Sequence, residues 1–383
     1  MRYCLYCGKD KPTEMFTTKE HVIPKALDGN LDGRNPFLLD NVCDGCNHSA
    51  GKHVDLPFAR GWLFSIDRTH CISDYQVIDE KAKIPLRHMG SLDEVAPVGL
   101  VCDFWFGPAG DLIYHFHKPF PDNLKGLSVS NIRAYRNDMD PGFVFVFLGS
   151  NNPVWQRVTA RAIWKSFKLA EVHAPQFERI DEDSWLKVVP KERLPLVDKL
   201  RKLKVHNSRS SIDLNAEPRF LCKLTLGMGE LFLKPNFKKS AEAEMFRKGM
   251  WAQGLKKREE LDIRGSGWTD RGGQNDDLGQ MLSWRYGHSI GLIALPHQGV
   301  ALFSSFYGKR TSIMRISDHQ NFWKSELEEG VFYLLCPAIR KCLGPYRYID
   351  FLFHNYGNRK IQELEDFEQS LNSIKENQPP RQI

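Results

Sequence analysis

The sequence predicts an α+β protein, in which a small N-terminal segment precedes a larger region of antiparallel sheets and helices. Two Cys-x-x-Cys pairs lie within the first 46 residues, a pattern typical of a compact, metal-stapled segment. Further along, short runs of alternating apolar and polar residues flank turn residues, which is typical of antiparallel strands. Apolar residues also recur at helical spacing. With 383 residues and 42% apolar content, the chain is long enough for two or three domains.

The two cysteine pairs predict a structural zinc site. Each tight turn presents two sulfurs, and two such turns supply the four thiolates of a closed tetrahedral site. The ligands would be Cys4, Cys7, Cys43 and Cys46. Zinc would then stabilise a segment that is too short to fold alone. Zinc ribbons that only bind nucleic acid or protein share this pattern, so the cysteines by themselves do not indicate an enzyme.

Three polar residues near the cysteines suit phosphodiester hydrolysis. Glu20 and His21 precede Val22-Ile23-Pro24, a short β-segment ended by proline, so their side chains point to opposite faces. One could hold a metal ion while the other reaches the substrate. A divalent ion neutralises charge on the scissile phosphate, and a neutral imidazole accepts a proton from attacking water. Asn47, at the start of the helix after Cys46, offers an amide oxygen, a ligand that Mg²⁺ accepts.

Together these residues resemble the HNH endonuclease family, whose nuclease domain is a ββα-metal finger. The resemblance covers residues 1–62, about a sixth of the chain. It is carried by Cys4-x-x-Cys7, Glu20-His21-Val22-Ile23-Pro24 and Cys43-x-x-Cys46-Asn47, with Gly51 and Asp55. It implies a nuclease that needs Mg²⁺ or Mn²⁺ for catalysis in addition to its structural zinc.

The resemblance also implies catalytic roles. Glu20 and Asn47 would bind the catalytic ion, and His21 would be the general base. The family's middle asparagine holds the loop that orients the base; Asn41 is the better candidate here, and Asn35 is the alternative. Glu20 stands where the family more often has aspartate. Its extra methylene leaves open whether it binds the ion directly or through water.

Two histidines follow Asn47, and neither lies four residues after it, where a second ligand on the same helical face would be. His53 could still contact the metal ion or a phosphate. His48 is expected to face solvent.

The chain beyond the finger is predicted to form three further segments. The predicted domains are residues 1–62, the HNH nuclease domain with structural zinc; 63–180, an α+β middle region; 181–264, a basic helical region; and 265–383, antiparallel strands plus helices that regulate the nuclease or recognise its target. Within the middle region we predict strands at 101–106 and 112–117, a strand at 143–148 and a helix at 154–172.

His115 and His117 lie two residues apart in one predicted strand and therefore share a face. They could pair on a metal ion. Because no third ligand is near them in the sequence, a half-exposed strand surface is the expectation.

Positive charge is concentrated in residues 186–264, which carry 19 Lys and Arg against 10 Asp and Glu, a net charge of +9, whereas the whole chain carries +6. Such a surface attracts a phosphate backbone without reading bases, although a solvated helix face has the same composition. The basic residues are Lys199, Arg201, Lys202, Lys204 and Arg209 in one cluster, and Lys238, Lys239, Arg247, Lys248, Lys256, Lys257 and Arg258 in another.

The remaining patterns predict structure and not chemistry. Residues 219–227 and 241–251 resemble the helical pair that follows the finger in many longer HNH proteins. Residues 264–275 are rich in glycine without the lysine of a phosphate-binding loop, so a surface loop is predicted. Residues 282–316 predict two or three antiparallel strands, and 360–383 predict a polar helix with a disordered end.

The sequence also bears on the compartment. No apolar run approaches 18 residues and no signal peptide precedes the first cysteine, so a cytoplasmic protein without a membrane partner is expected. The five other cysteines, Cys71, Cys102, Cys222, Cys336 and Cys342, are irregularly spaced and fit reduced thiols.

The leading hypothesis is a metal-dependent DNA endonuclease, a bacterial restriction or anti-phage effector whose C-terminal region recognises the target or restrains the nuclease. RNA as the substrate is one alternative, because the finger reads a phosphodiester. A non-catalytic, zinc-stabilised nucleic-acid-binding or adaptor protein is the other. A homodimer, a partner protein and a small-molecule activator are all compatible with the sequence.

Overall fold

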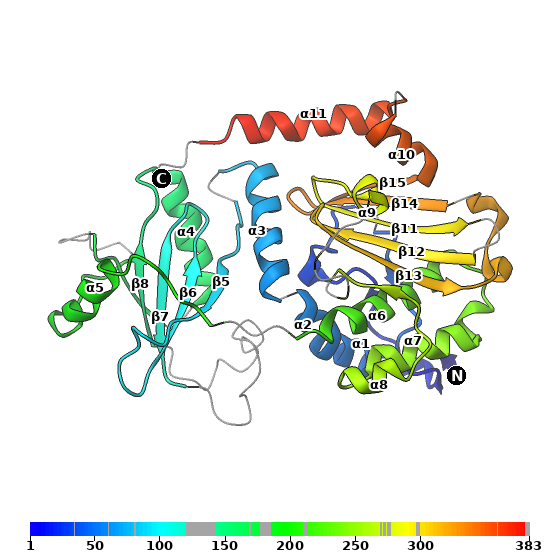
Figure 1. Cartoon of the computed structure of the whole chain (residues 1–383), viewed down its shortest axis with the longest axis horizontal. Helices are drawn as coiled ribbons and strands as arrows, with labels where there is room; N and C mark the ends of the chain where they lie inside the picture. Colours follow the sequence, from blue (N-terminus) through cyan, green and yellow to red (C-terminus); the bar gives the residue numbers. More distant parts are fainter. Residues whose placement is uncertain are drawn as a thin grey trace. The chain divides into compact units, whose positions relative to one another are not determined.

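The computed structural model describes residues 1–33, 35–59, 61–79, 82–119, 142–167, 170–176, 185–209, 213–268, 270, 273, 277–295, 299–328, 330–357 and 359–379. The chain divides into two compact units, and each is described by itself. Unit 1 comprises Met1–Ala59 and Asp213–Ser373, and unit 2 comprises Arg60–Ile212 and Ile374–Ile383. Both contain helices and sheets that are mostly antiparallel (Figure 1), so the predicted α+β class is confirmed.

The finger of unit 1, residues 1–59, consists of two short hairpins and a helical segment. In the first, β1 (Arg2–Tyr3) pairs with β2 (Asp10–Lys11). In the second, β3 (Glu20–His21) pairs antiparallel with β4 (Leu38–Leu39). The helix α1 (Asp44–Ala50) continues through a π-helical turn (Gly51–Asp55) into α2 (Leu56–Ala59). β3, β4 and α1 together make a ββα arrangement.

Residues 213–373 complete unit 1 with helices and a six-stranded antiparallel sheet of order β10-β13-β12-β11-β14-β15. The strands are β10 (Gly265–Ser266), β11 (His288–Leu295), β12 (Gly299–Phe306), β13 (Arg310–Ser317), β14 (Gly330–Cys336) and β15 (Lys341–Tyr346). The helices are α6 (Ala216–Phe232), α7 (Ala241–Trp251), α8 (Leu255–Glu259), α9 (Asp277–Leu282), α10 (Tyr348–Tyr356) and α11 (Gln362–Glu376), the last of which extends beyond unit 1.

The helix α6 connects the finger to this sheet through apolar packing. Phe220 of α6 stacks on Phe58 of α2 with ring centroids 4.1 Å apart, and Phe306 of β12 packs edge-on against both rings. Gly227 of α6 lies so close to Val22 that an added Cβ would come within 2.5 Å of the valine side chain. The finger and residues 213–373 therefore share one core, although residues 60–212 separate them in sequence.

Unit 2 is built around a five-stranded sheet of order β5-β6-β7-β8-β9, in which β8 and β9 are parallel and the other described neighbours antiparallel. Apolar side chains of α4 pack on one face of the sheet and those of α5 on the other. The elements are α3 (Trp62–Tyr75), β5 (Arg87–Ser91), β6 (Val101–Phe106), β7 (Leu112–His117), β8 (Phe143–Phe147), α4 (Pro153–Ser166), β9 (Glu171–His173) and α5 (Leu194–Arg201).

Most predicted elements are present. The strands predicted at 101–106 and 112–117 are β6 and β7, the one at 143–148 is β8, and residues 282–316 contain β11, β12 and β13. The predicted helical pair lies in α6 and α7. The predicted C-terminal helix is α11, and residues 380–383 lie outside the described part. The division into four consecutive domains stays a prediction. The two compact units are defined by which residues pack together, and each contains segments that are separated in sequence.

Two predictions about local structure are wrong, and a third holds only in part. The helix predicted at 154–172 ends at Ser166, and β9 begins at Glu171 because the backbone there pairs with β8. In the glycine-rich stretch predicted as a loop, Gly265 and Ser266 form β10 against β13, whereas its other described residues are neither helix nor strand; residues 269, 271, 272, 274 and 275 lie outside the described part. Finally, His115 and His117 are only 6% and 3% exposed, because residues of α4 and Phe167 cover that face of the sheet.

Candidate functional site

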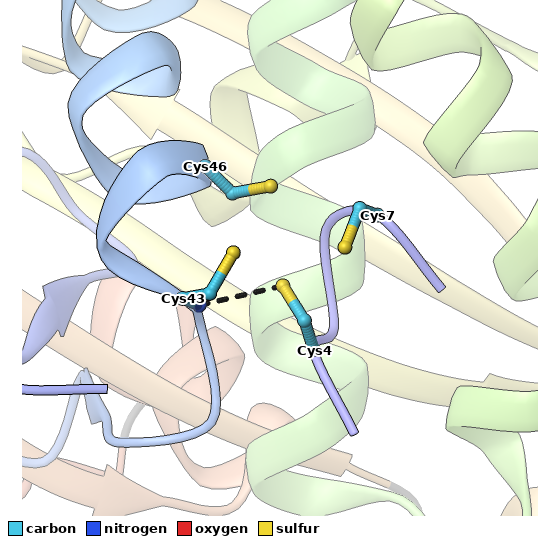
Figure 2. Close-up of side chains that lie close together, drawn as sticks. All are labelled: Cys4, Cys7, Cys43 and Cys46. Atoms are coloured by element: carbon cyan, nitrogen blue, oxygen red, sulfur yellow. Dashed lines mark hydrogen bonds between the residues drawn. The ribbon is translucent and has the colours of Figure 1, made fainter. Parts of the chain in front are cut away.

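The four cysteines of the finger converge on one point. Cys4 and Cys7 lie in the turn between β1 and β2, whereas Cys43 precedes α1 and Cys46 lies in its first turn. Their sulfur atoms face one another and all lie within 4.8 Å of each other (Figure 2). The backbone N–H of Cys43 also donates to Cys4 Sγ at 3.4 Å. Four convergent thiols match the donor set of a closed zinc site, so the residues fit a structural zinc ion.

The helix α7 holds the first cysteine turn from outside. The guanidinium of Arg247 donates from Nε to the carbonyl of Leu5 at 2.7 Å, and Trp251 Nε1 donates to the carbonyl of Tyr6 at 3.0 Å. Both carbonyls belong to the loop between Cys4 and Cys7. Arg247 is 5% exposed, so this member of the predicted basic cluster has a structural role in the finger and does not face nucleic acid.

His21 is half-buried on β3, and its ring is oriented by the backbone of Gly29. The Nδ1 atom of His21 lies 3.4 Å from the carbonyl oxygen of Gly29. The Asn35 side chain donates to the same oxygen at 2.9 Å, and its own Oδ1 accepts from the backbone N–H of Phe37. A Cβ at position 29 would lie 1.9 Å from the carbonyl oxygen of Ile23, so glycine is required for this close turn.

The surroundings of His21 favour a neutral imidazole. Burial lowers its pKa below the ordinary value and the positive charge of Lys25 lowers it further, whereas the hydrogen bond to Gly29 acts in the opposite direction. Because a carbonyl can only accept, the Gly29 oxygen favours a proton on Nδ1. The Nε2 lone pair of His21 is then able to accept a proton from water.

Glu20 faces the interior, opposite to His21, as the alternation of side chains along a strand requires. It is 3% exposed. Its Oε1 atom lies 2.6 Å from Lys223 Nζ and accepts a hydrogen bond from the Tyr6 hydroxyl at 3.0 Å. Lys223, on α6, also contacts Asp55 Oδ2 at 2.8 Å and donates to the carbonyl of His21 at 3.1 Å. One buried ammonium thus connects two carboxylates and the backbone of the strand that carries His21.

In this buried cluster, the lysine and the two carboxylates stabilise one another's charged forms. Burial lowers the pKa of Lys223, but Asp55 and Glu20 outweigh it, so its pKa lies above the ordinary value. Burial raises the pKa of Asp55 to about 6, with Lys223 acting in the opposite direction. Leaving the carboxylates without a cation would be costly, because a buried unpaired charge destabilises a fold strongly.

The cluster decides whether Glu20 fits a divalent ion. Ions such as Mg²⁺ bind carboxylate oxygens at about 2.0–2.1 Å. The Glu20 oxygen already has an ammonium nitrogen 2.6 Å away, and a divalent cation beside that charge would be repelled. Glu20 therefore does not fit such an ion while Lys223 contacts it.

The other predicted site residues lie nearby on the finger but make separate contacts. The Asn47 amide donates to Thr18 Oγ1 at 3.1 Å, and Asp44 accepts hydrogen bonds from Thr17 and Thr18. His48 and His53 are both exposed; burial lowers the pKa of His53 below its ordinary value, and so does Lys52.

Asn41 and Asn35 were the two candidates for the asparagine that supports the base. The Asn41 amide donates to Glu230 Oε1 of α6 at 2.7 Å. Asn35, the alternative, bonds to the Gly29 carbonyl beside His21. Their functional roles stay predictions.

Sequence reasoning did not find Lys223. Its partners Glu20 and Asp55 lie far away in the sequence, and no motif includes it. A signal was nevertheless present, because Lys223 interrupts the apolar run Phe220-Leu221-Cys222-Lys223-Leu224. A single lysine inside such a run is almost never buried unless it is paired.

The comparison with protein families agrees with this geometry: residues 4–63 match the HNH endonuclease family. The resemblance that the cysteines, Glu20-His21 and Asn47 carry is thereby confirmed, and the matched segment supports a nuclease. No characterised protein and no solved structure matches the chain significantly. In the described part of the chain, no helix is both long and apolar enough to cross a membrane.

Proposed function

We propose that this protein is an endonuclease that hydrolyses DNA phosphodiester bonds with His21 as the general base. The observation that carries the proposal is the orientation of His21 within the HNH-like finger. The Gly29 carbonyl faces Nδ1 at 3.4 Å, and burial together with Lys25 lowers the pKa of the ring, which favours its neutral form. A neutral, oriented imidazole at the edge of a zinc-stapled finger has the properties of a general base for water.

In this mechanism each residue has a defined part. His21 Nε2 accepts the proton of the attacking water, and Nδ1–H donates to the Gly29 carbonyl, so the tautomer is fixed. Asn35 holds that carbonyl through its amide at 2.9 Å. Lys223 holds the backbone of His21 from the interior side at 3.1 Å, so we assign it the role of a positioning residue.

A divalent ion would neutralise charge on the scissile phosphate and its leaving oxygen. The resemblance makes Glu20 and Asn47 its ligands, with His53 as a further donor. Because Lys223 contacts the Glu20 carboxylate, the proposed mechanism uses no ion bound to Glu20.

Exposed lysines of unit 1 supply the attraction for a phosphate backbone. Lys239, Lys248, Lys256 and Lys257 are all exposed around α7 and α8. We propose that they bind backbone phosphates without reading bases, so their contribution falls with salt. Arg247 and Lys238 are excluded from this role, because the first supports the finger and the second pairs with Glu230 at 3.1 Å.

A specific observation favours one alternative, a zinc-stabilised binding protein that does not cut. The pair of Glu20 and Lys223 removes the acidic ligand that the resemblance assigns to the catalytic ion. A finger in this arrangement keeps its zinc and its basic helices but lacks a divalent-ion site at Glu20.

Plasmid nicking separates the two functions. The intact chain is incubated with supercoiled plasmid and Mg²⁺ or Mn²⁺ over a concentration series, beside His21→Ala and the matched control His48→Ala, which changes an exposed histidine on α1. We expect metal-dependent nicking by the wild type and the control, and loss of nicking in His21→Ala. Binding without nicking by all three proteins would favour the non-catalytic alternative.

The wider role is proposed from the sequence alone. We propose a cytoplasmic restriction or anti-phage effector in which residues beyond the finger recognise the target or restrain cutting. Parallel digestion of DNA and RNA of the same sequence tests the substrate. Sedimentation with and without DNA tests whether a homodimer forms.

A further inference from the structure

Unit 2 contains a second group of metal-ligand side chains, far from the cysteines in sequence. Asp103, His115 and His117 are buried, and their potential ligand atoms all lie within 4.8 Å of one another. His88 joins them, with Nε2 at 3.7 Å from Asp103 Oδ1. We propose that these four residues form a closed transition-metal site that binds zinc.

The register of the sheet explains how the four side chains meet. In β6 and β7, Asp103 lies directly opposite His115, and His117 follows two residues later on the same face. In β5, His88 lies opposite Trp105, which shares the face of Asp103. Residues opposite one another in antiparallel strands project to the same side. Three neighbouring strands therefore present three imidazoles and one carboxylate to one point under α4.

The ring of His117 is placed as a ligating histidine would be. Its Nδ1 lies 2.7 Å from the backbone carbonyl of Lys118, which can only accept, so Nδ1 carries a proton. Its Nε2 points at the carboxylate and lies 2.9 Å from Asp103 Oδ2, so one metal ion could bind both atoms. A carbonyl on the second ring nitrogen is the usual outer partner of a ligating histidine.

His88 supplies an independent observation. Its Nε2 atom is buried and has no hydrogen-bond partner among the described residues, although it faces Asp103. A buried ring nitrogen without a partner loses the hydrogen bond that water would provide. A metal ion between the two would satisfy it.

The distances suit a tetrahedral ion. Zinc binds histidine nitrogen and carboxylate oxygen at about 2.0–2.2 Å, so a nitrogen and an oxygen on one tetrahedral ion are about 3.3 Å apart. His117 Nε2 lies 2.9 Å from Oδ2 of Asp103 and His88 Nε2 lies 3.7 Å from Oδ1, so each nitrogen is within about 0.4 Å of that separation from one oxygen of the carboxylate. Three imidazoles and one carboxylate favour zinc over Mg²⁺, which prefers oxygen ligands.

The site is built to hold the sheet together. Asp103 is fully buried, and Ser91 Oγ donates to its Oδ1 at 2.7 Å, which orients the carboxylate. Because four protein ligands close the coordination sphere, no position is left for substrate. The ion would tie β5, β6 and β7 to one another.

The test uses the intact, untagged chain. Zinc is counted by elemental analysis, and its ligands are identified by X-ray absorption at the zinc edge. We expect two zinc ions per chain and a mixed shell, with sulfur at about 2.3 Å and nitrogen or oxygen at about 2.0–2.1 Å. A shell of sulfur alone overturns the proposal, whatever the zinc content.

Variants then assign the second ion. His117→Gln is expected to lower the zinc content from two to one, whereas His206→Gln, a histidine of unit 2 outside the cluster, should retain two. Retention of two ions by His117→Gln contradicts the assignment. If His117→Gln does not fold, the absorption spectrum of the wild type still decides the question.

Discussion

The two units neutralise buried carboxylates in different ways. In unit 1, Glu20 and Asp55 share the ammonium of Lys223 at 2.6 and 2.8 Å. In unit 2, the ion-pair partners of Asp103 among the described residues are histidines, His88 and His117. In the first cluster the chain itself supplies the cation, through Lys223. In the second, the carboxylate is surrounded by imidazoles, and together they form the donor set of the zinc site proposed above.

The largest expected effect comes from removing the internal cation of unit 1. Lys223→Met leaves two buried carboxylates without a neutralising cation, and the free energy of unfolding should fall by about 3–5 kcal/mol. Denaturant unfolding of the intact chain measures it. The matched control Lys248→Met, on the exposed side of α7, should change stability by less than about 0.5 kcal/mol.

A companion variant sharpens this prediction. Adding Glu20→Gln and Asp55→Asn to Lys223→Met removes both uncompensated charges and should recover part of the loss. If Lys223→Met alone is as stable as the wild type, the ion cluster does not contribute as described.

The next effect concerns the histidine cluster of unit 2. His88→Gln should weaken binding of the ion. Without the ion, the strands β5 and β6 should unfold locally more often. Loss of a ligand present at a hundred times its dissociation constant corresponds to about 2.7 kcal/mol, or roughly a hundredfold faster amide exchange in these strands. Hydrogen exchange read by mass spectrometry tests it, and unchanged exchange of β5 and β6 would contradict a stabilising ion.

A smaller effect separates Asn35 and Asn41, the two asparagines that follow His21 in the sequence. On the proposed mechanism, Asn35→Ala frees the Gly29 carbonyl and should lower the single-turnover nicking rate about 10- to 100-fold, as for other outer partners of catalytic groups. Asn41→Ala breaks a bond to Glu230 of α6 and should affect stability more than rate. The reverse pattern would assign the supporting role to Asn41.

The smallest effect contrasts His21 with the histidines beside Asp103. In the described part of the chain, the His21 ring faces the Gly29 carbonyl and not a carboxylate, and burial and Lys25 lower its pKa. Because the base acts when neutral, nicking should persist below pH 6.5, the ordinary histidine pKa, and fall as the pH drops through the lowered value. Lys25→Gln removes one cause of the lowered His21 pKa, so the acid limb of the pH–rate profile should move to higher pH. If Lys25→Gln leaves the acid limb of the pH–rate profile unchanged, that limb reports the titration of a group other than His21.

The comparison also explains what the sequence could predict. The cysteine ligands are pairs within tight turns, so their spacing alone indicates a tetrahedral site. The histidine cluster depends on strand register, which aligns Asp103 with His115 only when β6 and β7 pair as they do. The sequence thus predicted the shared face of His115 and His117 but not their burial or their third and fourth partners.

The same distinction holds for the finger. The strand and helix that carry Glu20, His21 and Asn47 follow from short-range patterns, and the family match agrees with them. The partner of Glu20 was not predictable in this way. Lys223 lies on α6, and residues 60–212 separate that helix from the finger in the sequence. Residue spacing cannot report a contact that depends on how two distant segments fold together.

This last contact has a consequence for how the protein is made. A ribosome completes the finger long before it adds α6, so during that interval Glu20 and Asp55 have no lysine to balance them and the strand of His21 lacks its inner support. The N-terminal segment of a growing chain therefore lacks these contacts until position 223 has been translated. For the proposed nuclease, this order of synthesis would disfavour cutting by truncated products, since chains released before position 223 lack the lysine that contacts Glu20, Asp55 and the backbone of His21.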